Sequence, residues 1–339
     1  MQIMIWKNVE LFNVCEIEER WDGAIKMRRF PERALASMVR GTTTYACGVG
    51  SLTTGCEIRF VGEAANIVVS AGGDVDALVE IWRGDFLCRT ERLTPGMTRL
   101  LQLRLDCGVD RHDVSGYRGN FDTGVWRVVF GHEFCGYIHD VEAISPIRPP
   151  RPDEVPEKRL ICYGSSITHS AGAGSFTNSY ISTLGRLLGV DVMCKGMGGS
   201  CHIQPEVADY IAAETWDGAL LELGINMVDC FPVSVFEERA TYLVEQVLKV
   251  GKPVVLISNF YSHHCIPGAP FEATNRDYVA ALERIYEKHK CDRLFYIKGT
   301  DIVPDASYLT ADVIHPSPYG HAEMGRRIAH KLRNEFKIF

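Results

Sequence analysis

The second half of the chain alternates short apolar runs with longer amphipathic stretches, and this pattern limits the folds open to it. Apolar runs typical of strands occupy residues 160–163, 191–194, 219–223, 254–257 and 294–297. A helical pattern lies between each run and the next. Strands that alternate with helices form a parallel sheet covered by those helices. The sequence therefore predicts an α/β domain from residue 158 to residue 339.

The helices between these strands have recognisable ends. Gly189 is the expected stop of a helix that begins near Thr177, because glycine accepts the left-handed conformation at a helix end. Ser234 and Glu237 predict a capping box at the start of a helix that runs to 250–251. The final helix is expected to start at Ser317 and Pro318. This final helix carries Met324, Ile328, Leu332 and Phe336 at a spacing of four. Helices are also expected at 206–213 and 274–289.

The first half of the chain has a different sequence pattern. Short apolar or alternating runs at 56–60, 66–69, 78–82, 101–105 and 125–130 are separated by glycine, proline and asparagine turns. Regularly spaced strands with few helical signals favour an antiparallel β-sandwich. Proline is dense at 146–152 and blocks both helix and central strand. We therefore expect a sandwich domain at 1–145, a proline-rich linker at 146–157 and the α/β domain at 158–339.

Composition narrows the possible partners. The chain has 339 residues, 46% of them apolar, with a net charge of −7 and no long lysine or arginine run. A large core can form, and nucleic acid or an anionic membrane is not expected as a partner. A small-molecule substrate is expected. The N-terminus lacks the pattern of a signal sequence, and twelve scattered cysteines without a CxxC pair indicate reduced thiols, so we expect a cytoplasmic protein.

Four loops carry side chains suited to acyl transfer. Reactive groups of open parallel sheets gather beyond the carboxyl ends of the strands. The first three strands are followed there by Ser165 and Ser166, by the glycines 196, 198 and 199, and by Asn226. Asp312 lies three residues before His315, so its carboxylate can hold the imidazole in one tautomer while the far nitrogen takes a proton from a serine. This set predicts a serine esterase.

Each of these residues also has an ordinary structural interpretation. Ser166 could be a turn or N-cap residue, and the glycines could only permit a tight turn. Asn226 could form an Asx turn, and Asp312 with His315 could be a surface pair. The catalytic interpretation is favoured because all four blocks occur in the required order at strand ends or loops.

The four blocks resemble the SGNH branch of the GDSL esterase and lipase superfamily, over roughly residues 158–335. The resemblance implies a flavodoxin-like, three-layer α/β/α domain, here preceded by a jelly-roll-like antiparallel sandwich as in two-domain bacterial members. It also implies that Ser166 is the nucleophile and His315 the general base, oriented by Asp312. The oxyanion hole would be formed by the Ser166 N–H, the Gly199 N–H and the Asn226 side chain. No cofactor or metal is implied.

The blocks depart from the family pattern at three positions. Ser165 stands where aspartate is usual, Met227 follows Asn226 where aspartate usually follows, and Cys194 stands where asparagine is often found. None of the catalytic residue types is lost. The departures therefore bear on substrate preference more than on mechanism.

Other motifs are weaker. The run His263-His264-Cys265 resembles part of a metal site, but adjacent ligands rarely point at one ion, and a loop at the rim of the substrate pocket is the favoured interpretation. Residues 164–168 lack the Lys-Ser/Thr of a P-loop, and the chain lacks a GxSxG elbow.

Three functions remain open from the sequence. The leading one is hydrolysis of a small acyl ester, an acetyl group on a sugar or similar polyol, because two-domain members of the superfamily include carbohydrate esterases. The second is an acyltransferase that passes the acyl group to an alcohol other than water. The third is a noncatalytic glycan-binding protein. Oligomeric state is left open.

Overall fold

The computed structural model describes residues 3–39, 42–105, 108–112, 114, 116–117, 119–132 and 135–339. Contacts divide the chain into two compact units. The first consists of Met1–Pro31 and Ser51–Glu157, and the second of Glu32–Gly50 and Lys158–Phe339. The units are described separately below.

The segment Glu32–Gly50 groups with the second unit although it lies inside the range 1–145 expected for the sandwich. It forms two short helices, α1 (Glu32–Ser37) and α2 (Tyr45–Gly50). Ala34 and Leu35 of α1 are buried, and α1 packs against α5 (Pro205–Ala213). Helices of one to two turns give too little periodicity for the sequence pattern to show them.

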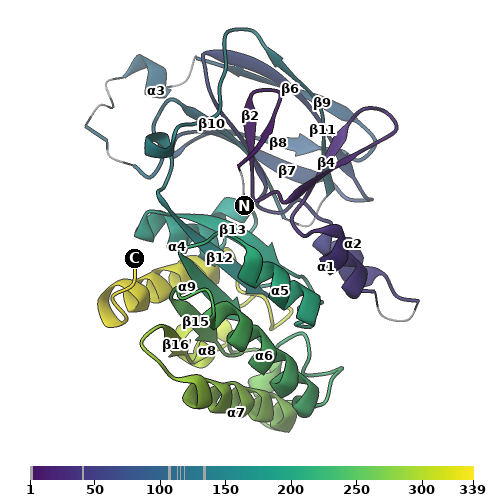
Figure 1. Cartoon of the computed structure of the whole chain (residues 1–339), viewed down its shortest axis with the longest axis vertical. Helices are drawn as coiled ribbons and strands as arrows, with labels where there is room; N and C mark the ends of the chain where they lie inside the picture. The colour runs from purple at the N-terminus through teal and green to yellow at the C-terminus, as the bar shows by residue number, and fades with distance from the viewer. Residues whose placement is uncertain are drawn as a thin grey trace. The chain divides into compact units, whose positions relative to one another are not determined.

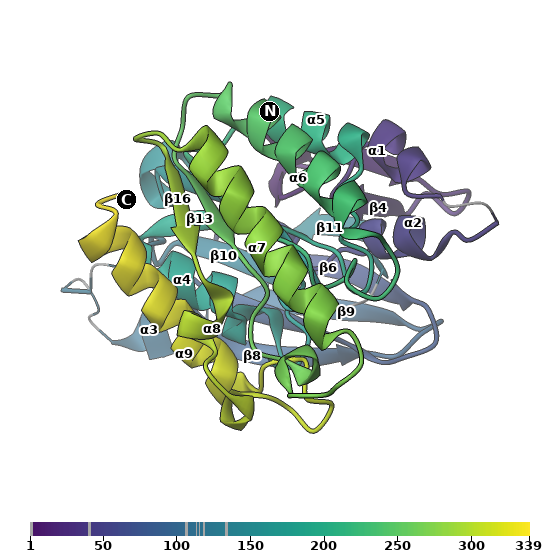
Figure 2. The same cartoon turned by 90° about the horizontal axis from the view of Figure 1, so that it is seen from below.

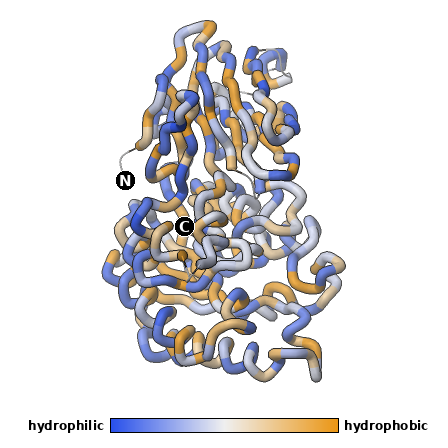
Figure 3. Tube along the Cα trace, turned by 90° about the vertical axis from the view of Figure 1, so that its right-hand side faces the viewer, coloured by the Kyte–Doolittle hydropathy of each residue, from blue (hydrophilic) through white to orange (hydrophobic). Residues whose placement is uncertain are grey.

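The first unit is built from two antiparallel sheets, which confirms the predicted β-sandwich. Figure 3 shows apolar and hydrophilic residues alternating along its strands, as expected for sheets with one face in the core. One sheet has the order β1 (Met4–Trp6), β2 (Val9–Phe12), β5 (Glu57–Val61), β10 (Val125–Phe130), β7 (Ala77–Arg83) and β8 (Phe86–Leu93). The other has the order β3 (Glu16–Glu19), β4 (Ile25–Arg28), β11 (Cys135–Ala143), β6 (Ala64–Gly72) and β9 (Thr98–Arg104).

The proline-rich segment after β11 is fixed to the first unit. Arg148 and Val61 exchange backbone hydrogen bonds of 2.8 and 3.0 Å. The Arg148 guanidinium forms an ion pair of 2.6 Å with Glu154, which ends the 3₁₀ turn η1 (Pro152–Glu154). The segment is therefore held against the end of β5.

The second unit contains one parallel sheet. Its order is β13 (Val190–Gly196), β12 (Lys158–Gly164), β14 (Gly218–Glu222), β15 (Val254–Ile257) and β16 (Leu294–Ile297). In chain order this is 2-1-3-4-5, the flavodoxin-like arrangement, so the predicted fold is confirmed. The five strands lie within one or two residues of their expected positions.

Helices cover both faces of this sheet (Figures 1 and 2). Right-handed crossovers change face where the strand order reverses, so the helix after β12 lies opposite those after the later strands. α4 (Tyr180–Leu188) packs with α9 (Pro318–His330), whereas α6 (Val233–Leu248) packs with α5 and with α7 (Glu272–His289). The second unit also contains the short helix α8 (Gly299–Ile302), 3₁₀ turns at Phe176–Asn178, His263–Cys265 and Ala306–Tyr308, and a π-helix at Lys331–Glu335. The short helix α3 (Gly108–Arg111) belongs to the first unit.

Two of the three expected helix ends are confirmed and one is wrong. α4 ends at Gly189, whose φ is 71°, and α9 begins at Pro318 after the cap Ser317. α6 does not start with a Ser234 capping box, because Pro232 is its N-cap and Ser234 already lies in the helix. Its proposed box partner Glu237 forms an ion pair of 2.9 Å with Arg284 of α7. No helix in the described ranges is long and apolar enough to cross a membrane.

Candidate active site

The candidate residues follow three neighbouring strands of the parallel sheet. Ser166 is the second residue after β12, and Gly199 and Asn226 follow β13 and β14. The strand order reverses beside β12, and the carboxyl ends at such a reversal leave room for a ligand. The sheet thus brings the first three sequence blocks to one edge.

Ser166, His315 and Asp312 form a continuous line of hydrogen bonds. The Oγ atom of Ser166 lies 2.8 Å from Nε2 of His315, across 149 positions of sequence. The Nδ1 atom of the same ring lies 2.7 Å from Oδ2 of Asp312. The Ser166 side chain is almost buried, whereas those of His315 and Asp312 are 26% and 47% exposed. A hydroxyl, an imidazole and a carboxylate in this order can pass a proton from the serine to the ring.

The turn before α9 organises the carboxylate of Asp312. Its Oδ1 atom accepts hydrogen bonds from the Thr310 hydroxyl at 2.8 Å, the Ile314 N–H at 2.9 Å and the His315 N–H at 3.0 Å. Partial burial raises the pKa of Asp312, but these bonds and the bond to the His315 ring lower it more. The pKa therefore lies well below its ordinary value, and the carboxylate stays charged beside the imidazole.

The same turn contains a backbone conformation that its residue disfavours. Val313 has a φ of 58°, in the left-handed region that β-branched residues rarely adopt. Its N–H donates to the Thr310 carbonyl at 3.0 Å, and its carbonyl accepts from the His263 N–H at 2.7 Å. The His263–Cys265 turn therefore contacts the loop of the candidate general base, as a rim of the site would.

The two other predicted oxyanion residues lie in loops with defined geometry. Gly199 has a φ of 61°, and a Cβ atom there would lie 3.2 Å from the hydroxyl of Tyr45 on α2. The Oδ1 atom of Asn226 accepts a hydrogen bond of 3.2 Å from the Cys201 N–H. Because the amide oxygen is used in this way, the amide nitrogen is the group left to donate elsewhere. The oxyanion roles of these residues remain predictions.

Two buried residues around the nucleophile loop were missed from the sequence. Glu222 accepts hydrogen bonds from the backbone and side chain of Ser165. The ring of His321 donates from Nε2 to the Ala171 carbonyl at 2.8 Å, and Ala171 donates to the Ser166 carbonyl at 2.9 Å. The one sequence signal was a glutamate at the end of an otherwise apolar strand, Gly218–Glu222.

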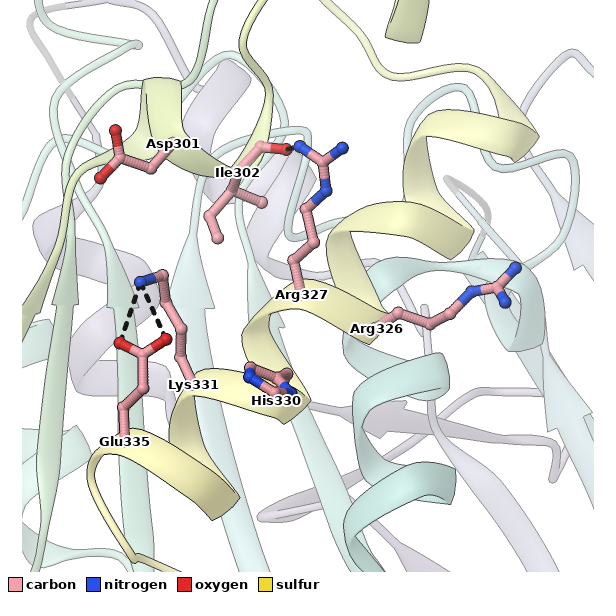
Figure 4. Close-up of a pocket in the computed structure, with 7 residues that line it drawn as sticks. All are labelled: Asp301, Ile302, Arg326, Arg327, His330, Lys331 and Glu335. Carbon is pink, nitrogen blue, oxygen red and sulfur yellow. Dashed lines mark hydrogen bonds and ion pairs between the residues drawn. The ribbon is translucent and has the colours of Figure 1, made fainter.

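Neither a metal site nor the hollow beside α9 offers a competing centre in the described chain. No group of three or more histidine, cysteine, aspartate or glutamate side chains in these ranges is arranged to hold a metal ion. A separate hollow of about 380 Å³ lies along α8, α9 and the π-helix (Figure 4). Its cations are engaged within the protein, since Arg327 donates to the Ile302 carbonyl at 2.9 Å and Lys331 pairs with Glu335 at 3.1 Å.

A flavodoxin-like sheet with a serine, a histidine and an aspartate in line at its carboxyl edge has the architecture of a serine hydrolase. Residues 157–333 match the GDSL-like lipase/acylhydrolase family. The chain belongs to this family and is a serine esterase. No curated protein sequence shows a significant match to the chain.

Solved structures of similar fold extend over both units. A salicylyl-acyltransferase from a tetracycline biosynthetic pathway has a TM-score of 0.77 at 18% identity, covering 96% of this chain and 94% of its own. A family two carbohydrate esterase from Cellvibrio japonicus has a TM-score of 0.65 at 11% identity, covering 98% and 96%. One from Clostridium thermocellum, in complex with cellohexaose, has a TM-score of 0.61 at 14% identity, covering 84% and 93%.

Proposed function

We propose that the protein hydrolyses a small acyl ester, an acetyl ester of a carbohydrate or similar polyol, through an acyl-enzyme on Ser166. The observation that carries the proposal is the hydrogen-bonded line from Ser166 through His315 to Asp312. The carbohydrate esterases among the structures of similar fold support the choice of alcohol. A cytoplasmic location remains a prediction, drawn from the scattered cysteines of the sequence, which include no CxxC pair.

The mechanism has two steps. The Ser166 hydroxyl attacks the ester carbonyl while its proton passes to Nε2 of His315. The tetrahedral intermediate collapses as His315 returns that proton to the leaving alcohol, which breaks the C–O bond of the ester. Water then attacks the acyl-enzyme and loses its proton to His315. His315 passes that proton to Oγ of Ser166 as the acyl C–O bond breaks, which releases the carboxylic acid and restores Ser166.

Charge on the substrate oxygen develops in both tetrahedral intermediates. The Ser166 N–H, the Gly199 N–H and the Asn226 amide are the proposed donors for that oxygen. Donors placed in advance cost no reorganisation during the reaction, so they stabilise the transition state more than the ground state. Asp312 stabilises the imidazolium that forms and does not itself take the proton.

An acyltransferase is the second candidate. The likeness to the salicylyl-acyltransferase covers nearly the whole of both chains, which supports keeping this alternative. The same three side chains would form the acyl-enzyme, and an alcohol would replace water in the second step. Product analysis separates the two: free acid marks a hydrolase, and a new ester formed faster than acid marks a transferase.

Labelling with a fluorophosphonate tests the proposed nucleophile. We expect the wild-type protein to be labelled at Ser166 and to release p-nitrophenol from p-nitrophenyl acetate and acetate from an acetylated oligosaccharide. Ser166→Ala should abolish both while leaving the thermal transition close to wild type, because a loop hydroxyl contributes little to stability.

Ser165→Ala is the matched control for this test. It removes the neighbouring hydroxyl and should have a milder effect on turnover than Ser166→Ala. Full turnover by folded Ser166→Ala would contradict the assignment, and the opposite order of effects would move the nucleophile to Ser165. Absence of labelling in folded wild-type protein would favour the noncatalytic glycan-binding alternative.

A further inference from the structure

A fully buried carboxyl group lies against the nucleophile loop, and the two-step mechanism leaves it without a role. Glu222 is the last residue of β14. Its Oε2 atom accepts the Ser165 N–H at 2.7 Å, the Ser165 hydroxyl at 2.7 Å and the Thr168 hydroxyl at 3.0 Å. The Oε1 atom has no hydrogen-bond partner among the described residues. A single oxygen therefore holds the chain on both sides of Ser166.

The hydrogen bonds continue from this oxygen into the loop and the adjacent helix. The Ser165 Oγ atom, which donates to Glu222, also accepts from the Ile167 N–H at 3.1 Å. The Thr168 hydroxyl lies 2.7 Å from that of Tyr180 at the start of α4. Because the Thr168 hydroxyl donates to Glu222, the Tyr180 hydroxyl donates to Thr168. The turn from residue 165 to residue 168 is thus tied to both a strand and a helix.

The end of β12 is shaped to admit this carboxyl group. A Cβ atom on Gly164 would overlap the Thr168 hydroxyl and would come within 2.6 Å of Glu222 Oε2. Glycine therefore allows the strand to end in contact with the carboxyl group. Any larger residue would push the nucleophile loop away from it.

The carboxyl group is costly at this position. Complete burial raises the pKa of Glu222 to about 7, against the lowering by hydrogen bonds from Ser165 and Thr168. An apolar side chain would fill the end of β14 without that cost. This cost of burying the carboxyl group is offset by the fixed positions of its three donors, the Ser165 N–H, the Ser165 hydroxyl and the Thr168 hydroxyl.

We infer that Glu222 is a positioning residue for acyl transfer, which holds the turn 165–168 so that the Ser166 hydroxyl faces His315. This inference rests on the proposed function of Ser166 and His315. Glu222 touches neither substrate nor the reacting atoms in this role, and it acts through Ser165. A nucleophile displaced by about 1 Å can lose about 10²-fold in rate, so the effect should appear in kcat.

Two substitutions of Glu222 test the inference. Glu222→Leu removes the acceptor, and we expect kcat on p-nitrophenyl acetate to fall about 10²-fold with KM within about threefold of wild type. Glu222→Gln keeps an amide oxygen in place of Oε2, and we expect kcat within about tenfold of wild type because the bonds lose only their charge assistance. Circular dichroism establishes that each variant is folded.

Glu214→Leu is the matched control for loss of a buried glutamate. Glu214 is buried, and neither of its carboxylate oxygens has a hydrogen-bond partner in the described ranges. Glu214 follows α5 and precedes the first residue of β14, whereas Glu222 is the last residue of that strand. We expect its kcat to equal that of wild type.

An exchange of groups keeps the test decisive where Glu222→Leu does not fold. Ser165→Asp places a second carboxyl group against Glu222 and should lower kcat through repulsion and loss of the donor. Adding Glu222→Gln supplies an amide N–H to the new carboxylate, so the double variant should recover kcat relative to Ser165→Asp alone.

Three results would overturn the inference. They are wild-type kcat in folded Glu222→Leu, a loss confined to KM, and no recovery in the double variant. Fluorophosphonate labelling separates this failure from failure of the proposed function. Equal labelling rates for wild type and Glu222→Leu refute only the role of Glu222, whereas absence of wild-type labelling refutes the serine mechanism itself.

Discussion

Asp312 holds His315 at two points: its Oδ2 atom lies 2.7 Å from the ring Nδ1, and its Oδ1 atom accepts the backbone N–H at 3.0 Å. One carboxylate therefore fixes both the tautomer of the ring and the turn that carries it. The short spacing of these two residues in the sequence is what makes this double contact possible.

Asp312→Asn should lower kcat/KM by on the order of 10²- to 10⁴-fold without abolishing activity, because the amide can stabilise the wrong ring tautomer. Hydrolysis of p-nitrophenyl acetate measures the change. Asp305→Asn is the control, since Asp305 caps a neighbouring 3₁₀ turn through Ser307 and contacts no ring. Full activity of Asp312→Asn would mean that Ser166 and His315 work as a dyad.

Asn226→Ala should reduce kcat by about 10²- to 10³-fold, as loss of one oxyanion donor does. Asn226→Asp is the informative companion, because it keeps the acceptor for the Cys201 N–H, removes the amide donor and adds a negative charge that repels the oxyanion. We expect both variants to lose kcat. A change confined to KM would instead identify Asn226 as a substrate-binding residue.

Gly199→Ala should lower both stability and kcat. The left-handed φ of 61° costs alanine about 1–2 kcal/mol, and the new methyl group would crowd the Tyr45 hydroxyl. Gly251→Ala carries the same backbone cost at a φ of 78°, with no atom within 4 Å of the added carbon. Urea unfolding should show a loss for both variants, the larger one for Gly199→Ala, and only Gly199→Ala should lose kcat.

Stability should depend on pH through Glu222. Burial raises the pKa of Glu222 from 4.5 to about 7, so the folded protein binds more protons than the unfolded chain between these values. This stabilisation is fully present below pH 4.5 and is lost as the pH rises through about 7, roughly 3 kcal/mol in all. Glu222→Gln should remove this dependence.

Urea unfolding at pH 5 and pH 8 measures the effect. The unfolding free energy of wild type should fall between these conditions by more than that of Glu222→Gln. Equal changes in the two proteins would show that the Glu222 carboxyl does not titrate differently on folding.

The sequence predicted the parallel sheet and the proximity of Asp312 to His315 well because both depend on local patterns. Apolar runs marked all five strands, and Asp312 and His315 share one turn. The N-cap of α6 was missed because proline at 232 presets its own φ of −62° and displaces the start from Ser234. The sequence around residues 232–237 therefore predicted that a helix begins there but not at which residue.

Contacts between distant elements were not predictable in the same way. Glu222 looks like one charge in an apolar strand, and only the pairing of β14 with β12 brings it against Ser165. Likewise, α1 and α2 are too short to give a periodic signal, and the packing of α1 against α2 and α5 is a tertiary contact.

The grouping of Glu32–Gly50 with the second unit makes that unit discontinuous in the chain. During synthesis, α1 leaves the ribosome well before α5, so its buried residues Ala34 and Leu35 must wait for a partner made later. A chain shortened to begin at Glu154 would lack these two helices as well as the sandwich. A test of the role of the sandwich with such a chain therefore needs, for comparison, a version that supplies residues 32–50 through a linker.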